Sequence, residues 1–259
     1  MSVDVDGLSV NAGTKVLVAN VTLEIATGTW CTVIGPNGAG KTTLVEAIAG
    51  LRRPSTGSVS ISGLALAAMT ERERARTIAL VPQQPVIPSG MSVYDYVALG
   101  RVAYHGLFHP ASAGDKRIVE SVLERMSLGD FRHRDVSTLS GGERQRMVLG
   151  RALAQSTMVI VLDEPITGLD LRHQMELLEL LKSEVAECNL TIVATLHDLT
   201  LAGQFADRLV LLDRGEVVLD GAAAQVIRSD ELALRYGMKL RVVDVDGADV
   251  VVPVRNQSP

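Results

Sequence analysis

Residues 35–42 have the composition of a loop that binds phosphate. They read GPNGAGKT, which fits the pattern G-x-x-x-x-G-K-[ST] in full, between an apolar run that predicts a strand and an apolar helical pattern. Gly38 and Gly40 allow backbone N–H groups to curl around phosphate oxygens. Lys41 brings a positive charge to the β and γ phosphates, and Thr42 brings a hydroxyl for Mg²⁺. This segment therefore predicts a nucleoside triphosphate site.

An acidic pair follows a second apolar run. Residues 158–165 read MVIVLDEP, so Asp163 and Glu164 stand at the end of an expected strand. An Asp in that place can hold Mg²⁺ through water, and the neighbouring Glu can act as a general base toward an attacking water. Taken alone, such a pair is more often a solvated strand end. The phosphate loop pattern in the same chain favours the catalytic interpretation.

The segment LSGGER at 139–144 predicts the start of a helix. Ser140 as N-cap and Glu143 three residues later have the spacing of a capping box. Capping does not account for Gly141 and Gly142, because a glycine in a helix costs about 1 kcal/mol relative to alanine. Glycines are useful there if another group must approach the backbone closely. We therefore expect this helix start to face an anion.

The pattern of apolar residues predicts the elements that position these segments. In the first third, apolar residues alternate with polar ones at Val21, Leu23 and Ile25, as in a half-buried strand. Thr70 and Glu73 have capping-box spacing at a further helix start. From about 85 to 155 the pattern is helical, and after that strands and helices alternate. The alternation favours βαβ units and a parallel sheet.

Composition excludes several classes of protein. Apolar residues make up 47% of the 259 residues, which is enough for a full core and argues against disorder. The net charge of −5 argues against a protein that holds nucleic acid through its phosphates. Cys31 and Cys188 lack metal or disulfide spacing, and we expect both to be small core residues in a reducing compartment. No run of about 20 apolar residues occurs, so we expect a cytoplasmic chain that reaches a membrane only through a partner.

A set of motifs in one order resembles the ATP-binding subunit of ABC transporters. The motifs are GPNGAGKTT, Gln83 in LVPQ, LSGGERQRM, VLDEP, TGLD at 167–170 and His197 in ATLHD. The resemblance runs from about residue 8 to about 220. It implies an α/β fold, with a P-loop NTPase core built on a mostly parallel sheet, an N-terminal antiparallel β subdomain and an inserted helical subdomain. We expect residues 1–259 to form a single ATP-binding domain, with the helical subdomain at about 85–155 and a C-terminal extension at about 221–259.

The resemblance also implies a role for each matching residue. Glu164 would be the base and His197 would hold the γ-phosphate. Gln83 would contact Mg²⁺ and the attacking water, and would relay the state of the nucleotide to the helical subdomain. The Mg²⁺ ligands would be Thr42, Gln83 and Asp163. The phosphate loop would comprise Gly35, Pro36, Asn37, Gly38, Ala39, Gly40, Lys41, Thr42 and Thr43.

A head-to-tail homodimer enclosing two ATP molecules is a further implication of the resemblance. In such a dimer, Ser140, Gly141 and Gly142 of one chain cap the γ-phosphate bound by the other chain, and Asp170 lies at the seam. Two departures from the family pattern stand out. Residues 8–17 lack the aromatic side chain that usually stacks on adenine, and Ile166 stands where Thr usually follows the DEP motif.

Two segments favour one group within the family. Residues 92–108 and the run 226–253 resemble importers of iron–siderophore complexes, haem and vitamin B12 (cobalamin). This implies transmembrane permease subunits as partners, a substrate-binding protein on the far side of the membrane, and a peripheral position on the cytoplasmic face. Three alternatives stay open: an ABC ATPase for another cargo, either metal-ion import or export; a soluble ABC ATPase outside transport; and a module that binds ATP without hydrolysing it. The last is disfavoured by Glu164 and His197.

Overall fold

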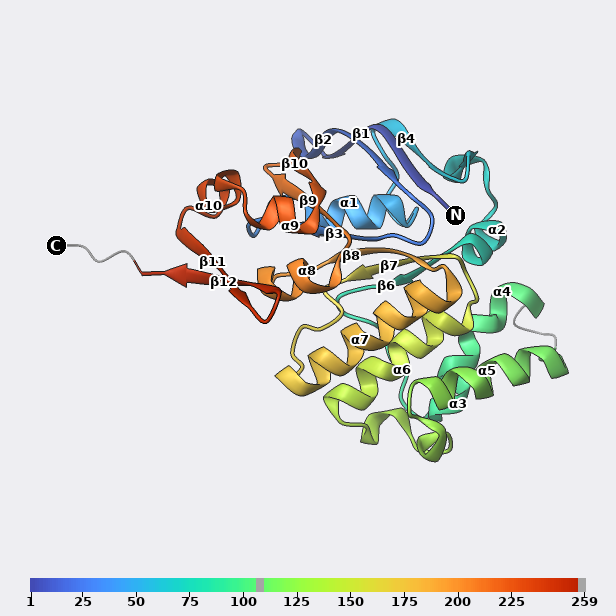
Figure 1. Cartoon of the computed structure of the whole chain (residues 1–259). Helices are drawn as coiled ribbons and strands as arrows, with labels where there is room; N and C mark the ends of the chain where they lie inside the picture. The colour runs from blue at the N-terminus through green and yellow to red at the C-terminus, as the bar shows by residue number, and fades with distance from the viewer. Residues whose placement is uncertain (106–109, 256–259) are drawn as a thin grey trace.

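Two large β-sheets, with helices between and beside them, form most of the molecule (Figure 1). The computed structural model describes residues 1–105 and 110–255. Residues 106–109, which include the end of the segment 92–108 in the expected helical subdomain, are outside the described residues. Residues 256–259 of the expected C-terminal extension are outside them as well.

The N-terminal sheet is antiparallel and has the strand order β2-β1-β4-β5. Its strands are β1 (Val3–Ala12), β2 (Lys15–Ile25), β4 (Thr56–Ile61) and β5 (Leu64–Ala65). Along β2 the apolar residues at 21, 23 and 25 are buried while 22 and 24 are exposed. The predicted alternation is thus confirmed, and it gives the sheet one apolar face to pack on the rest of the chain.

The central sheet has the order β10-β9-β3-β8-β7-β6. Its parallel strands are β3 (Trp30–Ile34), β6 (Ile78–Val81), β7 (Val159–Asp163), β8 (Thr191–Thr195) and β9 (Arg208–Asp213), and the edge strand β10 (Glu216–Ala222) is antiparallel. Every residue of β3, β7 and β8 is buried, as expected when helices cover both faces of a parallel sheet. The predicted α/β fold with a mostly parallel sheet is confirmed.

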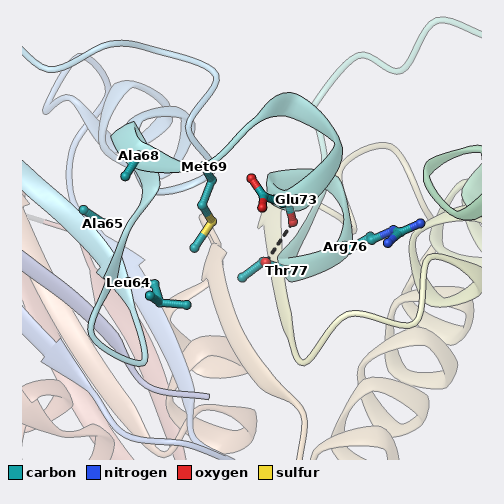
Figure 2. Close-up of a pocket in the computed structure, with 7 residues that line it drawn as sticks. All are labelled: Leu64, Ala65, Ala68, Met69, Glu73, Arg76 and Thr77. Atoms are coloured by element: carbon teal, nitrogen blue, oxygen red, sulfur yellow. Dashed lines mark hydrogen bonds between the residues drawn. The ribbon is translucent and has the colours of Figure 1, made fainter.

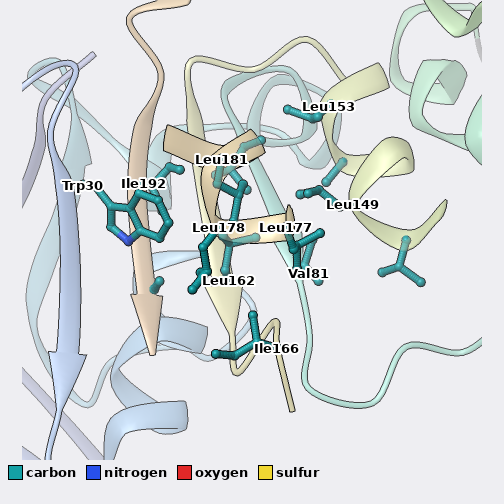
Figure 3. Close-up of a cluster of buried hydrophobic side chains, with 14 of the residues drawn as sticks. Trp30, Val81, Leu149, Leu153, Leu162, Ile166, Leu177, Leu178, Leu181 and Ile192 are labelled. Carbon is teal, nitrogen blue, oxygen red and sulfur yellow. The ribbon is translucent and has the colours of Figure 1, made fainter. Parts of the chain in front are cut away.

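Successive residues of the central strands point into two separate cores. On one face, Cys31 and Val33 pack with α1 (Lys41–Ile48), which lies between the two large sheets (Figure 1). On the other face, Trp30 and Ile192 pack with α6 (Gly141–Ala154), α7 (Leu171–Cys188) and α8 (Leu199–Phe205). Figure 3 shows this second core, in which Leu162 and Ile166 lie beside Leu177, Leu178 and Leu181. Burying each such side chain stabilises the folded chain by about 1.5–3 kcal/mol relative to leaving it exposed.

The inserted helices lie on the far side of the second core from the N-terminal sheet (Figure 1). They are α3 (Val93–Ala98), η2 (Leu99–Arg101), α4 (Val102–His105), α5 (Ala113–Arg125), the turns η3 (Gly129–Phe131) and η4 (Val136–Thr138), and α6. A buried ion pair between Arg101 and Asp115, 2.9 Å apart, joins η2 to α5. A hydrogen bond from the Ser112 hydroxyl has the largest effect on the pKa of Asp115, and one from Arg101 has the next largest. Together they lower this pKa to about 2. Before this insert, the chain forms η1 (Leu66–Ala68) and α2 (Glu71–Thr77).

After β10 the chain folds back along the molecule. It forms α9 (Ala223–Ile227), α10 (Asp230–Tyr236) and a hairpin of β11 (Lys239–Val245) and β12 (Ala248–Val254). The amide of Val251 donates to the hydroxyl of Thr200 at 3.0 Å, so the hairpin is attached to α8. This segment therefore packs against the helices that cover the central sheet.

The expectation for the two cysteines is right for one and wrong for the other. Cys31 is buried in β3, where burial raises the pKa of its thiol to about 12. Cys188 is exposed. It has helical spacing with Leu181, which is buried, but residues 186–188 in the last turn of α7 are all exposed. The apolar pattern of α7 extends beyond the part of the helix that the core covers. The prediction that Cys188 is a core residue is therefore wrong.

Candidate functional site

The phosphate loop pattern forms the connection between β3 and α1. The backbone has positive φ at Gly35 (147°), Gly38 (80°) and Gly40 (103°), a region in which glycine is favoured. A Cβ atom at Gly35 would lie 2.0 Å from the carbonyl oxygen of Leu212, and one at Gly40 would lie 2.5 Å from that of Leu17. Neighbouring backbone therefore leaves no room for a side chain at either position.

Lys41 is buried beneath the same loop. Its Nζ donates to the carbonyl oxygens of Gly35 at 2.7 Å and Pro36 at 3.1 Å. Burial lowers the pKa of the ammonium, and the charges of Glu164 and Asp163 act in the opposite direction. The positive charge is thus held at the centre of the loop and close to the acidic pair.

Asp163 stands at the carboxyl end of β7, beside β8. Its Oδ1 accepts hydrogen bonds from the hydroxyl of Thr195 at 2.7 Å and from that of Thr42 at 3.3 Å. A hydroxyl from the start of α1 and a carboxylate from β7 therefore meet at one point. Such oxygens are the ligands that Mg²⁺ prefers, and one or two of them are enough when phosphates and water complete the shell.

Glu164 is the next residue, and its carboxylate is held by side chains from three segments. Gln83 donates to Oε2 at 2.7 Å, Thr167 donates to Oε2 at 3.1 Å, and His197 contacts Oε1 through Nε2. Its backbone N–H donates to Thr195 Oγ1 at 2.8 Å. Gln83, Glu164 and His197 are thus brought together although they lie far apart in the sequence. A carboxylate oriented in this way can accept a proton from a nearby water.

A cavity of about 490 Å³ opens over the loop and the acidic pair. Its lining includes Glu164, His197 and residues 37–43, together with Lys15, Val16, Leu17 and Arg214. Those last four side chains are not identified by the sequence motifs, because pairing within the sheets brings them to the site. No aromatic side chain from residues 1–105 or 110–255 lines the cavity. Val16, which is 53% exposed, and the aliphatic part of Arg214 are the surfaces available to a base.

Ser140, Gly141 and Asp170 do not line this cavity. The predicted capping box of Ser140 and Glu143 is confirmed at the start of α6, and its hydrogen bonds lower the pKa of Glu143. Ser140 and Gly141 are exposed, and no atom lies within 4 Å of a Cβ built at Gly141.

A neighbouring helix explains the second glycine of this segment. A Cβ at Gly142 would lie 2.7 Å from Cδ2 of His173 in α7. Asp170 caps α7 by accepting from the His173 amide at 2.9 Å, and its carboxylate contacts His173 Nδ1 at 2.7 Å. The hydrogen bonds of His173 lower the pKa of Asp170. Ser140, Gly141 and Asp170 are thus exposed beside His173, whereas Leu139 and Gly142 are buried, and none of the five lines the cavity over the phosphate loop.

A separate hollow of about 360 Å³ lies between β5, η1 and α2 (Figure 2). Its lining combines small or flexible apolar side chains, such as Leu64 and Met69, with Glu73 and Arg76. The capping box predicted from Thr70 and Glu73 is confirmed at the start of α2. This hollow has no glycine loop or acidic pair of the kind that lies at the nucleotide cavity.

Two kinds of feature are absent from residues 1–105 and 110–255. No helix there is both long and apolar enough to cross a bilayer. No group of three or more His, Cys, Asp or Glu side chains is placed to hold a metal ion in that part of the chain.

A phosphate loop between a parallel strand and a helix, with an acidic pair at the end of a nearby strand, defines a P-loop nucleoside triphosphatase. Comparison with known proteins makes this more specific, because a sequence profile described as "ABC transporter" matches residues 18–167. The chain belongs to the ABC transporter family and is one of its ATP-hydrolysing nucleotide-binding domains. The resemblance drawn from the ordered motifs is confirmed.

Curated relatives align along nearly the whole chain. An iron(3+)-hydroxamate import ATP-binding protein of Bacillus subtilis (strain 168) is 34% identical over 258 residues, covering 100% of this chain and 93% of the relative. A ferric enterobactin transport ATP-binding protein of Escherichia coli (strain K12) is 35% identical, covering 97% and 94%. A hemin import ATP-binding protein of Rhodopseudomonas palustris (strain ATCC BAA-98 / CGA009) is 38% identical, covering 92% and 89%.

Solved structures agree with this assignment. A metal-chelate type ABC transporter in an inward-facing conformation superposes with a TM-score of 0.86 at 25% identity, covering 98% of each chain. A dimeric ATP-binding cassette in a post-hydrolysis state, bound to ADP and Pi, superposes with a TM-score of 0.75 at 27% identity, covering 85% of this chain and 98% of that one.

Proposed function

We propose that this chain hydrolyses ATP to drive import of an iron–siderophore complex, haem or cobalamin through a membrane permease. The observation that carries the catalytic part is the convergence of Gln83, Thr167 and His197 on the Glu164 carboxylate, beside the phosphate loop. The cargo class rests on the names of the relatives, which are import subunits for iron(3+)-hydroxamate, ferric enterobactin and hemin, and for cobalamin in Halobacterium salinarum.

The phosphates are bound by residues 35–43, the loop whose glycines leave room for backbone donors. Lys41 neutralises charge on the β and γ phosphates by exchanging a loop carbonyl for a phosphate oxygen. The adenine lies against Val16 and Arg214, which replace the usual aromatic contact. Contact with an aliphatic surface is less selective than aromatic stacking, so we expect the chain to accept other purine nucleotides as well.

Mg²⁺ fits the oxygens of Thr42 and Asp163, with the side-chain oxygen of Gln83 as a third ligand. The ion supplies neutralisation of phosphate charge when it is bound. Glu164 orients a water and accepts its proton, while His197 holds the Glu164 carboxylate in place and reaches the γ-phosphate. Gln83 contacts the same carboxylate, so its position depends on the state of the site.

Two copies of the chain pair head to tail as a homodimer. Support comes from the exposed start of α6, whose N-terminal backbone amides attract an anion while Gly141 leaves its surface open. In the dimer, Ser140, Gly141 and Gly142 of one chain cap the γ-phosphate bound by the other, and Asp170 lies at the seam. A relative of known structure is a dimeric cassette bound to ADP and Pi.

The chain works at the cytoplasmic face of the membrane as a peripheral subunit. Its partners are permease subunits, and a substrate-binding protein acts on the far side. The insert at about 85–155 receives the permease, and residues 221–259 form a C-terminal extension of the single ATP-binding domain. Nucleic acid is not a partner, in keeping with the net charge of −5.

The test uses Glu164→Gln, which keeps the size of the side chain and one acceptor oxygen for Gln83 and Thr167 but removes the base. We expect this variant to form a dimer on size exclusion when ATP and Mg²⁺ are present, because bound ATP is no longer consumed. The double variant Glu164→Gln with Lys41→Ala is the control, and it should stay monomeric because it cannot hold the phosphates. A Glu164→Gln protein that binds ATP and still elutes as a monomer would contradict the head-to-tail assembly.

A further inference from the structure

A tyrosine from the C-terminal segment contacts the first residue of the phosphate loop. The backbone N–H of Gly35 donates to the hydroxyl of Tyr236 at 2.9 Å, across 201 positions of sequence. Tyr236 is the last residue of α10, and its side chain packs against the second core. Burial raises the pKa of the phenol to about 12, so the hydroxyl is neutral at physiological pH. The contact is therefore a neutral hydrogen bond between a buried glycine amide and a half-buried tyrosine.

Gly35 is held from two other directions as well. Its carbonyl oxygen accepts from Lys41 Nζ at 2.7 Å, and the backbone of Leu212 fills the space where a side chain would stand. The residue after it is Pro36, which has no N–H of its own and fixes the backbone that follows. The Tyr236 hydroxyl is thus the hydrogen-bond partner that sets the direction of the peptide entering the loop.

The same helix, α10, also contacts the β9–β10 turn, which lines the cavity. Arg235 donates to Asp213 at 3.4 Å, directly before Arg214, which lines the cavity. The N–H of Gly215, one residue further, donates to the carbonyl of Ala39 within the phosphate loop at 2.8 Å. The last two residues of α10 therefore connect to the phosphate loop in two ways. Tyr236 contacts Gly35 directly, and Arg235 is linked to Ala39 through the β9–β10 turn.

We propose that Tyr236 is a positioning residue for nucleotide binding, so that α10 is part of the nucleotide site. The inference rests on the proposed function, because it assumes that the loop binds the phosphates of ATP. Without the hydroxyl, the buried N–H of Gly35 has no partner, and the loop samples conformations in which its other amides do not converge. Nucleotide binding must then order the loop, which lowers the affinity.

The test compares Tyr236→Phe with Tyr104→Phe. Tyr104 is the control, because its hydroxyl also bonds to a distant backbone group, donating to the carbonyl of Gln155 at 2.9 Å, but lies in the helical insert. The dissociation constant for ATP is measured by calorimetric titration of the full chain, and melting temperatures are measured without nucleotide. We expect Tyr236→Phe to raise the dissociation constant roughly tenfold, and Tyr104→Phe to leave it unchanged.

Two further readouts separate positioning from general destabilisation. In steady-state hydrolysis, Tyr236→Phe should raise the KM for ATP with little change in kcat, because Glu164 and its partners are untouched. Hydrogen exchange at the amides of Ile34 and Gly35 should become faster in Tyr236→Phe and stay unchanged in Tyr104→Phe. The proposal is overturned if Tyr236→Phe melts at a lower temperature but binds ATP as tightly as the wild type. A wild-type chain that does not bind ATP would instead contradict the proposed function itself.

Discussion

At the scale of single residues, Glu164 combines backbone strain with dense hydrogen bonding. Its φ of 50° lies in the left-handed region, which costs roughly 1–2 kcal/mol for a residue with a Cβ atom. The strain is offset by Thr195, whose hydroxyl accepts from the Glu164 amide and donates to Asp163. One hydroxyl therefore fixes both acids of the pair.

Replacing Thr195 with valine tests this role. The change keeps the shape of the side chain but leaves the Glu164 amide unpaired and releases Asp163, and an unpaired buried group costs about 1–3 kcal/mol. We expect the melting temperature to fall and kcat for ATP hydrolysis to fall roughly tenfold, since 1.4 kcal/mol of lost transition-state stabilisation has that effect. Thermal melts and steady-state hydrolysis at saturating ATP measure the two quantities.

The same strand supplies the control for this experiment. Thr191, at the other end of β8, also accepts one hydrogen bond, from the Gly28 amide, and donates one, to the Met1 carbonyl. Thr191→Val should lower the melting temperature to a similar extent with kcat unchanged. Equal turnover by the two variants would show that Thr195 acts on stability alone.

At the scale of elements, the two glycines at the start of α6 have different surroundings. Gly142 is required inside the chain, since the ring of His173 occupies the space of its Cβ. Gly141 has no such neighbour, and the capping box would form equally well with alanine there. The sequence predicts that another group lies close to the backbone of both glycines. In the structure that group is the ring of His173 at Gly142, and no atom lies within 4 Å of a Cβ built at Gly141.

Alanine substitutions at the two glycines should therefore have opposite effects on stability. Gly141→Ala should stabilise the isolated chain by up to about 1 kcal/mol through helix propensity. It should also reduce ATP turnover at least tenfold, because in the proposed head-to-tail dimer the methyl group would occupy the surface that faces the partner's nucleotide. Gly142→Ala should destabilise the chain by about 1–3 kcal/mol through the clash with His173. Denaturant melts and hydrolysis assays measure both, and normal turnover by Gly141→Ala would count against the dimer.

The sequence predicts the parts of the site whose physics is local. The loop at 35–43 and the capping boxes at Ser140 and Thr70 depend on residues within a few positions, so spacing reveals them. Thr195 and Tyr236 act through partners that only the sheet pairing and the return of the C-terminal segment bring near. No local pattern marks such residues.

At the scale of the whole molecule, the helical insert and the core are held together at one corner. Arg72 and Arg76 of α2 donate to the carbonyl oxygens of Ala103 and Tyr104 at the end of α4. Gln155, after α6, donates back to the carbonyl of Ile78 at the start of β6. These contacts connect the insert to the strand that leads to Gln83.

Co-expression with a cognate permease tests the place of the chain in a transporter. No helix in the described part of the chain is long and apolar enough to cross a bilayer. If the proposed function is right, the permease retains the protein on membranes. We expect most of the protein in the membrane fraction with the cognate permease, and release by alkaline carbonate, as for a peripheral subunit. With an unrelated permease it should stay in the supernatant. The same distribution with both permeases would contradict the transport function.

The position of β3 at the centre of the sheet has a consequence for synthesis on the ribosome. Its neighbours are β8 and β9, which begin at Thr191 and Arg208. At about 5–20 residues per second, roughly 8–30 s pass between translation of Ile34 and of Thr191. During that time an apolar strand has no partner on either edge, and the nascent chain is open to aggregation. The strand that carries the phosphate loop is among the first made and among the last to be enclosed.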